Sequence, residues 1–212
     1  MRTLINDDCM KVAAPKCRFM LTDIPYGEVS KPSNGLRILD KGKADAETFN
    51  IQEFLDHTYA AYDICTIFCG YGQFSEIAKY FADKPGTMRP YVWAKSNPSP
   101  LNGQYVLLSG VEVAIWFKKR GTGELSKKCQ KNWSAHPTGS SKIHPTEKNH
   151  KLLEELITIN TKEGDLVFDP CMGSGSTGVV AEKLGREFYG VELDPHYYNV
   201  AKERLEKESK NF

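Results

Sequence analysis

The chain has 212 residues, the size of one domain, and is long enough to bury a hydrophobic core without disulfide or metal staples. Hydrophobic residues make up 40% and charged residues 26%, a composition that excludes a disordered chain and a membrane-embedded one. The 28 basic residues nearly balance the 27 acidic ones, which argues against a uniformly basic protein that coats nucleic acid. Any contact with a polyanion therefore requires a local basic patch.

The N-terminal segment and the cysteines indicate a cytoplasmic protein. No stretch reaches the roughly 20 apolar residues of a membrane helix, and residues 1–10 lack the apolar run of a signal peptide. The six cysteines form no C-x-x-C pair, and the histidines are not at zinc-finger spacing. We therefore expect free thiols in a reduced compartment, no membrane contact and no metal site.

Apolar runs alternate along the chain with stretches of helical periodicity. They predict, in order, a strand at 18–22, a mobile loop at 28–45, a helix at 46–62, a strand at 63–69, a helix around 74–81, strands at 90–95 and 111–118, an aperiodic stretch at 118–142, a helix at 146–160, a strand at 165–169, a helix at 175–184 and a strand at 187–192. Asp194 and Pro195 then form the N-cap and first turn of a last helix. This alternation predicts an α/β fold with a doubly wound, mostly parallel sheet and helices on both faces, in a single domain over 1–212.

The segment 167–177 is a strand that runs into a glycine-rich turn and then opens a helix. Gly173 and Gly175 let the backbone pass close to a ligand, and the helix N-terminus offers free N–H groups. Glu192 ends the next strand, where an acid binds ribose hydroxyls in doubly wound nucleotide sites. The pattern is not G-x-G-x-x-G and lacks a phosphate-binding lysine, so it favours a nucleoside without a phosphate chain over a dinucleotide or a triphosphate. The alternative is a glycine-rich turn that joins strand to helix and binds no ligand.

The turn reads DPCMGSGST at 169–177, with HPTEK at 144–148 before it and GVE at 190–192 after it. These segments resemble the S-adenosylmethionine-binding half of amino-group DNA methyltransferases, although Cys171 replaces the usual phenylalanine and Asn149 the usual proline. The resemblance runs from about Leu4 to Leu205 and implies a Rossmann-like methyltransferase sheet with S-adenosyl-L-methionine as cofactor. It implies that the cofactor is held by residues of these motifs and of two strand ends: Asp8, Cys9, Asp23, His144, Thr146, Lys148, Asp169, Pro170, Met172, Gly173, Ser174, Gly175, Thr177 and Glu192.

The sequence DIPY at 23–26 follows an apolar strand and resembles the family motif Asp-Pro-Pro-Tyr, with isoleucine at the second position. An exocyclic amine of a base is a poor nucleophile, because its lone pair is delocalised into the ring. The Asp23 carboxylate and the Ile24 carbonyl would each accept one N–H and localise that lone pair, with Pro25 holding Ile24 extended. Tyr26 would stack on a base swung out of the duplex. The alternative is a turn that merely ends a strand.

The catalytic turn precedes the cofactor loop, which resembles the beta arrangement of motifs in this family, a circularly permuted sheet. The arrangement predicts that the two ends of the chain lie close together. Residues 4–7 would form the strand beside 187–192, and Asp8 and Cys9 would stand beside the cofactor adenine. The alternative role for Asp8 is a solvated helix cap.

The stretch 118–142 carries seven basic residues and only one acid, Glu124, with Trp133 and His136 among them. Basic groups release counterions from phosphates and an indole can stack on bases, so we expect a short target-recognition insert that binds DNA. A solvated loop is the alternative. Because the insert is short, we expect a short recognition site, help from a second subunit in a homodimer, or a weak sequence preference. The segment at 93–98 resembles a family segment near the target base, but Trp93 suits the core equally. The basic residues are Lys118, Lys119, Arg120, Lys127, Lys128, Lys131 and Lys142.

The resemblance implies a DNA methyltransferase of bacterial or phage origin, of the kind found in restriction-modification systems. An aspartate at position 23 is typical of N6-adenine enzymes, whereas N4-cytosine enzymes more often carry serine there. An N4-cytosine or RNA-directed methyltransferase stays open. So does a catalytically weak, nucleic-acid-binding regulatory subunit, because Ile24 departs from the family motif.

Overall fold

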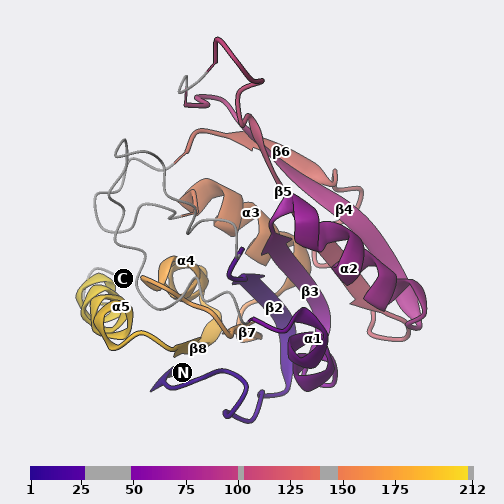
Figure 1. Ribbon diagram of the computed structural model, residues 1–212. Helices are drawn as coiled ribbons and strands as arrows, with labels where there is room; N and C mark the ends of the chain where they lie inside the picture. The colour runs from indigo at the N-terminus through magenta and orange to yellow at the C-terminus, as the bar shows by residue number, and fades with distance from the viewer. Residues whose placement is uncertain (27–48, 100–102, 139–147, 210–212) are drawn as a thin grey trace.

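The computed structural model describes residues 1–26, 49–99, 103–138 and 148–209, and the predicted loop at 28–45 lies outside them. An eight-stranded sheet crosses the molecule in the order β1-β8-β7-β2-β3-β5-β4-β6 (Figure 1). Neighbouring strands are parallel except at β5, which is antiparallel to β3 and β4, so the predicted mostly parallel sheet is confirmed. The strands are β1 (Arg2–Asn6), β2 (Cys17–Asp23), β3 (Tyr62–Cys69), β4 (Gly86–Lys95), β5 (Val111–Lys119), β6 (Trp133–His136), β7 (Leu166–Asp169) and β8 (Glu187–Glu192).

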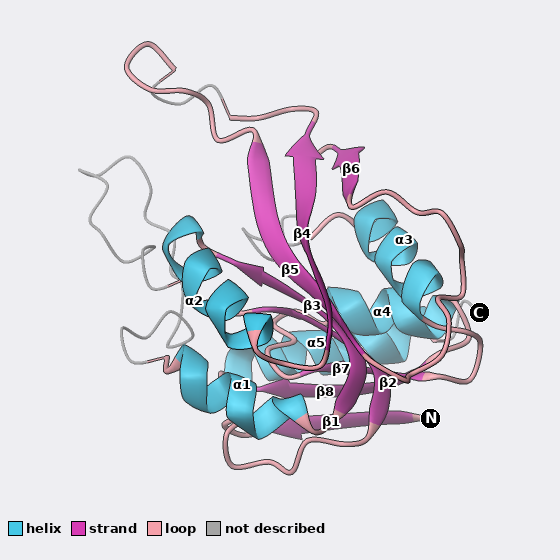
Figure 2. Cartoon of the chain, turned by 90° about the vertical axis from the view of Figure 1, so that its right-hand side faces the viewer, coloured by secondary structure: helices cyan, strands magenta, loops and turns pink. Residues whose placement is uncertain are grey.

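Helices cover both faces of the sheet, as predicted (Figure 2). One face carries α1 (Ile51–Tyr59) and α2 (Tyr71–Ala82). The other carries α3 (His150–Asn160), α4 (Ser176–Lys183) and α5 (Pro195–Glu208). No helix of the described chain is long and apolar enough to cross a membrane.

The central strands β2 and β3 are buried on both sides, which explains why they appear in the sequence as continuous apolar runs. Side chains alternate between the two faces of a strand. In β2, Phe19 and Leu21 therefore pack with α3, α4 and α5, whereas Met20 packs with α1 and α2. Ile64 and Cys65 divide between the same two cores in β3.

Several element boundaries differ from the sequence prediction. The helix predicted at 46–62 begins at Ile51, because the Asn50 side chain caps it by accepting from the Glu53 N–H. It ends before Tyr62, which pairs with Cys17 in the sheet. The helix predicted from 146 begins at His150, after an asparagine cap.

The stretch at 118–142, which the sequence predicts to be aperiodic, contains parts of two strands. Its first two residues, Lys118 and Lys119, complete β5, and Trp133–His136 form β6 at the edge of the sheet, parallel to β4. Four residues are too few for a readable apolar period, and β6 is held mainly by its pairing with β4.

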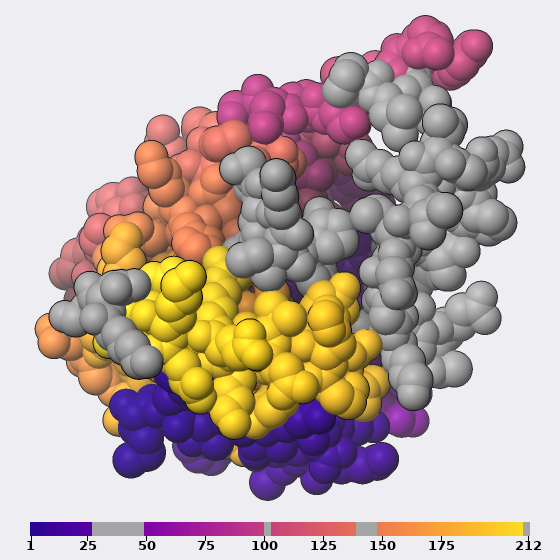
Figure 3. Space-filling model, turned by 90° about the vertical axis from the view of Figure 1, so that its left-hand side faces the viewer, coloured from indigo at the N-terminus to yellow at the C-terminus, as the bar shows by residue number. Residues whose placement is uncertain are grey.

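The two ends of the chain lie side by side, as the permuted arrangement predicts (Figure 3). Strand β1 pairs with β8 in parallel, with Asn6 opposite Glu192. The Arg2 guanidinium donates to the Glu182 carboxylate on α4 and, at 2.8 Å, to the Leu205 carbonyl on α5. The cofactor half of the sheet is therefore assembled from both ends of the chain.

Helix α4 lies close against β8 because residue 178 is glycine. A Cβ at Gly178 would lie 2.5 Å from a ring carbon of Phe188 and 3.1 Å from a methyl carbon of Leu205. We expect Gly178→Ala to lower the free energy of unfolding by roughly 1–3 kcal/mol through overpacking, as measured by urea denaturation. Lys202→Ala on the exposed side of α5 is the control and should change it by no more than about 0.5 kcal/mol. Equal effects of the two substitutions would contradict this packing.

Candidate active site

Three acids of the predicted site lie at the carboxyl edge of the parallel strands. In the chain, β2 is followed by β3, its neighbour on one side in the sheet. β7, the neighbour of β2 on the other side, is followed by β8, which lies further out on that side. The connections therefore leave β2 and β7 in opposite directions, and a topological switch point lies between these two strands. Ligands of open α/β sheets bind at such a point, outside the strand ends. Asp23 ends β2, Asp169 ends β7 and Glu192 ends β8, which places all three acids along this one edge.

The glycine-rich turn between β7 and α4 is fixed by Glu192. Gly173 and Gly175 have φ values of +52° and +78°, a backbone conformation that residues with a side chain rarely adopt. The Glu192 carboxylate accepts hydrogen bonds from the Gly173 N–H and from the Asp194 N–H, each at 2.8 Å. Burial raises the pKa of Glu192, and these backbone N–H groups oppose the rise. One buried carboxylate thus holds the turn and the start of α5 together.

The turn fits a nucleoside ligand. A Cβ built on Gly173 would meet nothing within 4 Å, so the backbone there borders open space that a ligand can approach. Each carboxylate oxygen of Glu192 has a second lone pair beyond the backbone bond that it accepts, which leaves acceptors for ribose hydroxyls. The N-terminus of α4 opens at Ser176, directly after Gly175.

Other predicted cofactor residues lie inside the turn. Met172 is 4% exposed and packs within the core beside Gly190. Pro170, Ser174 and Thr177 are also buried. These side chains shape the turn from within, while its backbone borders the open side. His144 and Thr146 lie outside the described residues.

Asp169 is a structural acid within the turn. It is 3% exposed, and its Oδ1 accepts from the Cys171 N–H at 3.2 Å. Burial raises the pKa of Asp169 to about 7, against the hydrogen bonds from Thr177, Thr22 and the Cys171 N–H, which lower it. The side chain therefore supports the backbone of the turn.

The raised pKa makes stability depend on pH. Between about pH 4 and pH 7 the native protein keeps a proton on Asp169 that the unfolded chain has released, so the free energy of unfolding falls as the pH rises through this window. The loss is on the order of 4 kcal/mol at most. Asp169→Asn is neutral at every pH, and we expect it to gain stability relative to wild type between pH 5 and pH 8 in urea denaturation. A constant difference between the two proteins would contradict this.

The turn after β1 reaches the cofactor loop. Asp8 Oδ1 accepts from the Met10 N–H at 3.0 Å, and the Asp8 carbonyl accepts from the Lys11 N–H at 2.9 Å. Asp8 thus caps its own turn, which favours the capping alternative. The thiols of Cys9 and Cys171 are hydrogen-bonded to each other. This hydrogen bond, together with burial, raises the pKa of Cys171 well above its usual value.

The turn at 23–26 is held on both sides. The Ile24 N–H donates to the Phe68 carbonyl at 3.2 Å, and the Ile24 side chain is 2% exposed in the core under α1 and α2. The Pro25 carbonyl accepts from Gln73 Nε2 at 2.7 Å, and Gln73 Oε1 accepts from the Gly70 N–H at 2.9 Å. The isoleucine that departs from the family motif is therefore fixed by strand pairing and by packing.

Both oxygens of the Asp23 carboxylate are oriented by neighbours. The Tyr26 hydroxyl donates to Asp23 Oδ1 at 2.5 Å, and Lys148 Nζ donates to Asp23 Oδ2 at 2.5 Å. Burial raises the pKa of Tyr26, and the charge of Asp23 raises it further. The structure thus places Lys148, which the resemblance assigns to the cofactor, on the carboxylate of the predicted catalytic turn.

Lys148 is the buried member of a partly buried chain of ion pairs that the sequence did not predict. Its Nζ is also 2.9 Å from Glu112 Oε2, and Glu112 Oε1 is 2.9 Å from Lys95 Nζ. Burial lowers the pKa of Lys148, but Asp23, Tyr26 and Glu112 together raise it well above its usual value. Burial raises the pKa of Glu112, but the two lysines lower it by more, so that the pKa lies below its usual value. The available signal was one acid inside an otherwise apolar strand, VEVAIWF at 111–117.

Residues 18–203 match the model of the N6/N4 family, which is described as DNA methylase. The chain belongs to this DNA methylase family. In the structure the DIPY turn and the glycine-rich turn follow two neighbouring strands, β2 and β7, at the same edge of the sheet.

Relatives of this chain are found among curated proteins and solved structures. Type II methyltransferase M2.DpnII of Streptococcus pneumoniae is 38% identical over 133 residues, which are 62% of this chain and 46% of the relative. M2.LlaDCHI of Lactococcus lactis subsp. cremoris is 34% identical over 140 residues, 54% of this chain and 49% of the relative. The chain thus spans about half the length of these curated relatives. The M1.HpyAVI–SAM complex superposes with a TM-score of 0.75 at 27% identity, and covers 97% of this chain and 100% of the other.

The described basic residues of the stretch 118–142 do not form one patch beside the site. Because β5 runs antiparallel, its end at Lys118 lies opposite Ile64, four residues along β3 from Phe68, the partner of Asp23. Four residues correspond to about 13 Å along a strand. The strand that carries Lys118 and Lys119 therefore ends at the opposite edge of the sheet.

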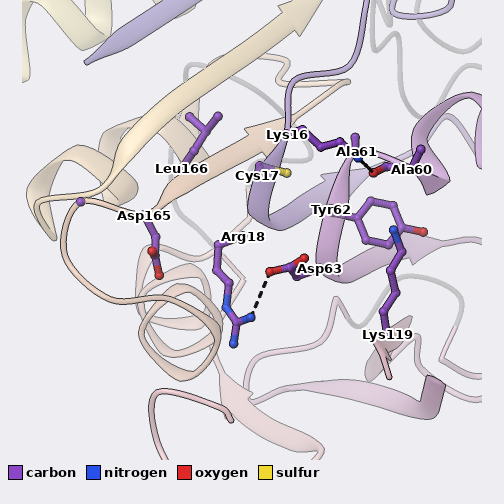
Figure 4. A pocket seen from close by; sticks show the side chains of 11 residues that line it. Lys16, Cys17, Arg18, Ala60, Ala61, Tyr62, Asp63, Lys119, Asp165 and Leu166 are labelled. Carbon is purple, nitrogen blue, oxygen red and sulfur yellow. Dashed lines mark hydrogen bonds and ion pairs between the residues drawn. The ribbon is translucent and has the colours of Figure 1, made fainter. Parts of the chain in front are cut away.

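Lys119 is occupied at that opposite edge. Its Nζ donates to the Tyr59 carbonyl and lies 4.8 Å from the Tyr62 ring centroid. It lines a hollow of about 480 Å³ in which Arg18 pairs with Asp63 (Figure 4). Two further basic groups lie at the same edge, since the Arg120 N–H donates to the Pro85 carbonyl and Lys127 N to the Ile159 carbonyl near the end of α3.

The remaining members of the predicted DNA-binding set are spread out. Lys128 forms an exposed pair with Glu124, and Lys142 lies outside the described residues. Lys131 Nζ lies 4.8 Å from the Trp133 ring centroid, and Trp133 is 50% exposed at about the level of the site but four strands from β2. Trp93 is a core residue, 2% exposed, whose Nε1 donates to the His136 carbonyl. A DNA contact of Lys131 and Trp133 stays a prediction.

Proposed function

We propose that the chain is an S-adenosylmethionine-dependent DNA methyltransferase that methylates the exocyclic N6 amine of adenine. The observation that carries the proposal is the placement of an oriented carboxylate, Asp23, beside Tyr26 at the switch point, along the same strand edge as the glycine-rich turn and Glu192. Membership of the DNA methylase family and the similarity to M1.HpyAVI, a structure in complex with SAM, support it.

The cofactor half would bind the donor. Glu192 would accept the ribose hydroxyls, and the open backbone at Gly173 would border the nucleoside. The bound donor supplies an electrophilic methyl group on a sulfonium. The carboxylates along this edge, Asp23 and Glu192, complement the positive charge of such a ligand.

The catalytic turn would prepare the amine. An ionised carboxylate has about four acceptor positions, and Tyr26 and Lys148 occupy two of those on Asp23. A free position on Asp23 would accept one N–H of the amine and the Ile24 carbonyl would accept the other. The two bonds favour a pyramidal nitrogen with a localised lone pair, aimed in line at the methyl group. The Tyr26 ring would stack on a target base taken out of the duplex.

The choice of adenine follows from Asp23. In this family an aspartate at the first position of the motif is typical of N6-adenine enzymes, and serine is more typical of N4-cytosine enzymes. The competing functions are an N4-cytosine or RNA-directed methyltransferase and a weakly active regulatory subunit. The anchored Ile24 argues against the last, because its carbonyl keeps a fixed position after Asp23.

The proposal is tested by expression in a host that lacks DNA methylation, followed by sequencing that detects modified bases in their context. We expect N6-methyladenine in one sequence context in cells with the wild-type chain and none in cells with Asp23→Ala. N4-methylcytosine alone would overturn the adenine assignment. No modified base in the DNA, together with labelled RNA from the purified protein, would favour the RNA-directed alternative.

A further inference from the structure

The partly buried carboxylate of Glu112 stands between two lysines at the start of β5. Its side chain is 22% exposed, and its two oxygens lie 2.9 Å from Lys95 Nζ and 2.9 Å from Lys148 Nζ. Lys148, whose side chain is 9% exposed, reaches Asp23 on its other side. Two acids and two lysines thus alternate from Lys95 to Asp23, with balanced formal charge.

We propose that Glu112 is a positioning residue for methyl transfer, acting through Lys148 on Asp23, an inference that rests on the proposed function. Glu112 attracts an N–H donor of Lys148 that would otherwise turn to Asp23. Asp23 therefore keeps a free, correctly aimed acceptor for the target amine. Lys95 neutralises the charge that Glu112 brings to the site.

Without Glu112, the Lys148 ammonium would lose one of the two carboxylate partners that the described residues provide. An ammonium has three N–H donors, and a buried ammonium requires carboxylate partners. With Glu112 removed, Asp23 is the one carboxylate that contacts Lys148 among the described residues. The ammonium would then move fully onto Asp23 and occupy the acceptor position that the amine needs. In the intact site the ammonium is also fixed 5.0 Å from the Phe68 ring centroid.

Glu112→Gln tests this in the full chain, because glutamine keeps the shape and loses the charge. We expect kcat to fall about tenfold or more, a typical cost of a misplaced reacting group, with KM for S-adenosylmethionine and for DNA within about twofold of wild type. Glu182→Gln is the matched control, since Glu182 on α4 also forms a partly buried ion pair, with Arg2 on β1. It should leave kcat unchanged. A wild-type kcat in Glu112→Gln, or a loss confined to KM, would overturn the inference.

A second measurement needs no activity. Asp23→Asn leaves Lys148 paired with Glu112, and Glu112→Gln leaves it paired with Asp23, but the double variant leaves a buried ammonium without a carboxylate. We expect the double variant to lose more stability in urea than the sum of the two single losses. If the wild-type protein is active but the two stability losses are additive, the inference about Glu112 is overturned and the proposed function is not. A wild-type protein that methylates no nucleic acid would overturn the proposed function and this role with it.

Discussion

Asp23→Ala is expected to lower kcat for methyl transfer by roughly 10³-fold while leaving the affinity for S-adenosylmethionine within about threefold. The carboxylate accepts an N–H of the amine and favours the pyramidal nitrogen, so its bond gains strength in the transition state. Such an interaction affects kcat more than ground-state binding. The expected result is measured by single-turnover transfer of a labelled methyl group and by calorimetry of cofactor binding.

Two observations keep this experiment interpretable. Lys148 retains Glu112 as a partner when Asp23 is removed, so the variant should fold, as a thermal melt will check. Asp63→Ala is the matched control, because Asp63 lies at the opposite end of the neighbouring strand and pairs with Arg18 there. It should keep the wild-type kcat. More than about a tenth of wild-type activity in Asp23→Ala would contradict the catalytic role of the DIPY turn.

Glu192→Gln is the second substitution with a large expected effect, and it should weaken S-adenosylmethionine binding by roughly 10- to 100-fold, or about 1.4–2.8 kcal/mol. The carboxylate accepts from two backbone N–H groups, those of Gly173 and Asp194. An amide presents an NH₂ group to one of these donors, which breaks that bond and loosens the turn. The charge-assisted bonds to the ribose hydroxyls are lost as well.

Calorimetry on the purified variants measures this effect. The control is Glu187→Gln at the start of the same strand, where the side chain is 42% exposed and lies at the other edge of the sheet. It should bind the cofactor like wild type. Equal cofactor affinities of the two variants would refute the ribose role of Glu192.

The cofactor half was largely predictable from sequence because its signals are local. A strand, two glycines, a helix start and an acid at the next strand end lie within one stretch of the chain, and the structure has Gly173 and Gly175 at positive φ with Glu192 on the turn. The permuted arrangement was also predictable, since the order of the motifs resembles the beta arrangement of the family, which implies that the two ends of the chain supply neighbouring strands. The pairing of β1 with β8 confirms it.

The ion-pair chain was not predictable, because its members come from four separate segments. Lys95, Glu112 and Lys148 meet Asp23 only when β4, β5 and the segment before α3 are placed around the end of β2. No local pattern selects one of the many lysines as partner for a given acid. The assignment of Lys148 to the cofactor came from the motif around it, whereas its contacts depend on tertiary packing.

The described basic residues of 118–142 are spread over the fold for a physical reason of a different kind, and their contact with DNA stays a prediction. Charge counted along the sequence gives no direction for the strand that carries it. Because β5 runs antiparallel to β3, residues after Lys118 emerge at the edge of the sheet away from Asp23. The chain then returns through β6, which brings Trp133–His136 back to the level of the site.

The most direct test of the central claim is mass spectrometry of nucleosides from DNA that has been incubated with the purified protein and methyl-labelled S-adenosylmethionine. The predicted result is labelled N6-methyl-2′-deoxyadenosine with the wild-type chain and none with Asp23→Ala. Label in 4-methyl-2′-deoxycytidine alone, label in RNA alone, or label with both proteins alike would contradict the account.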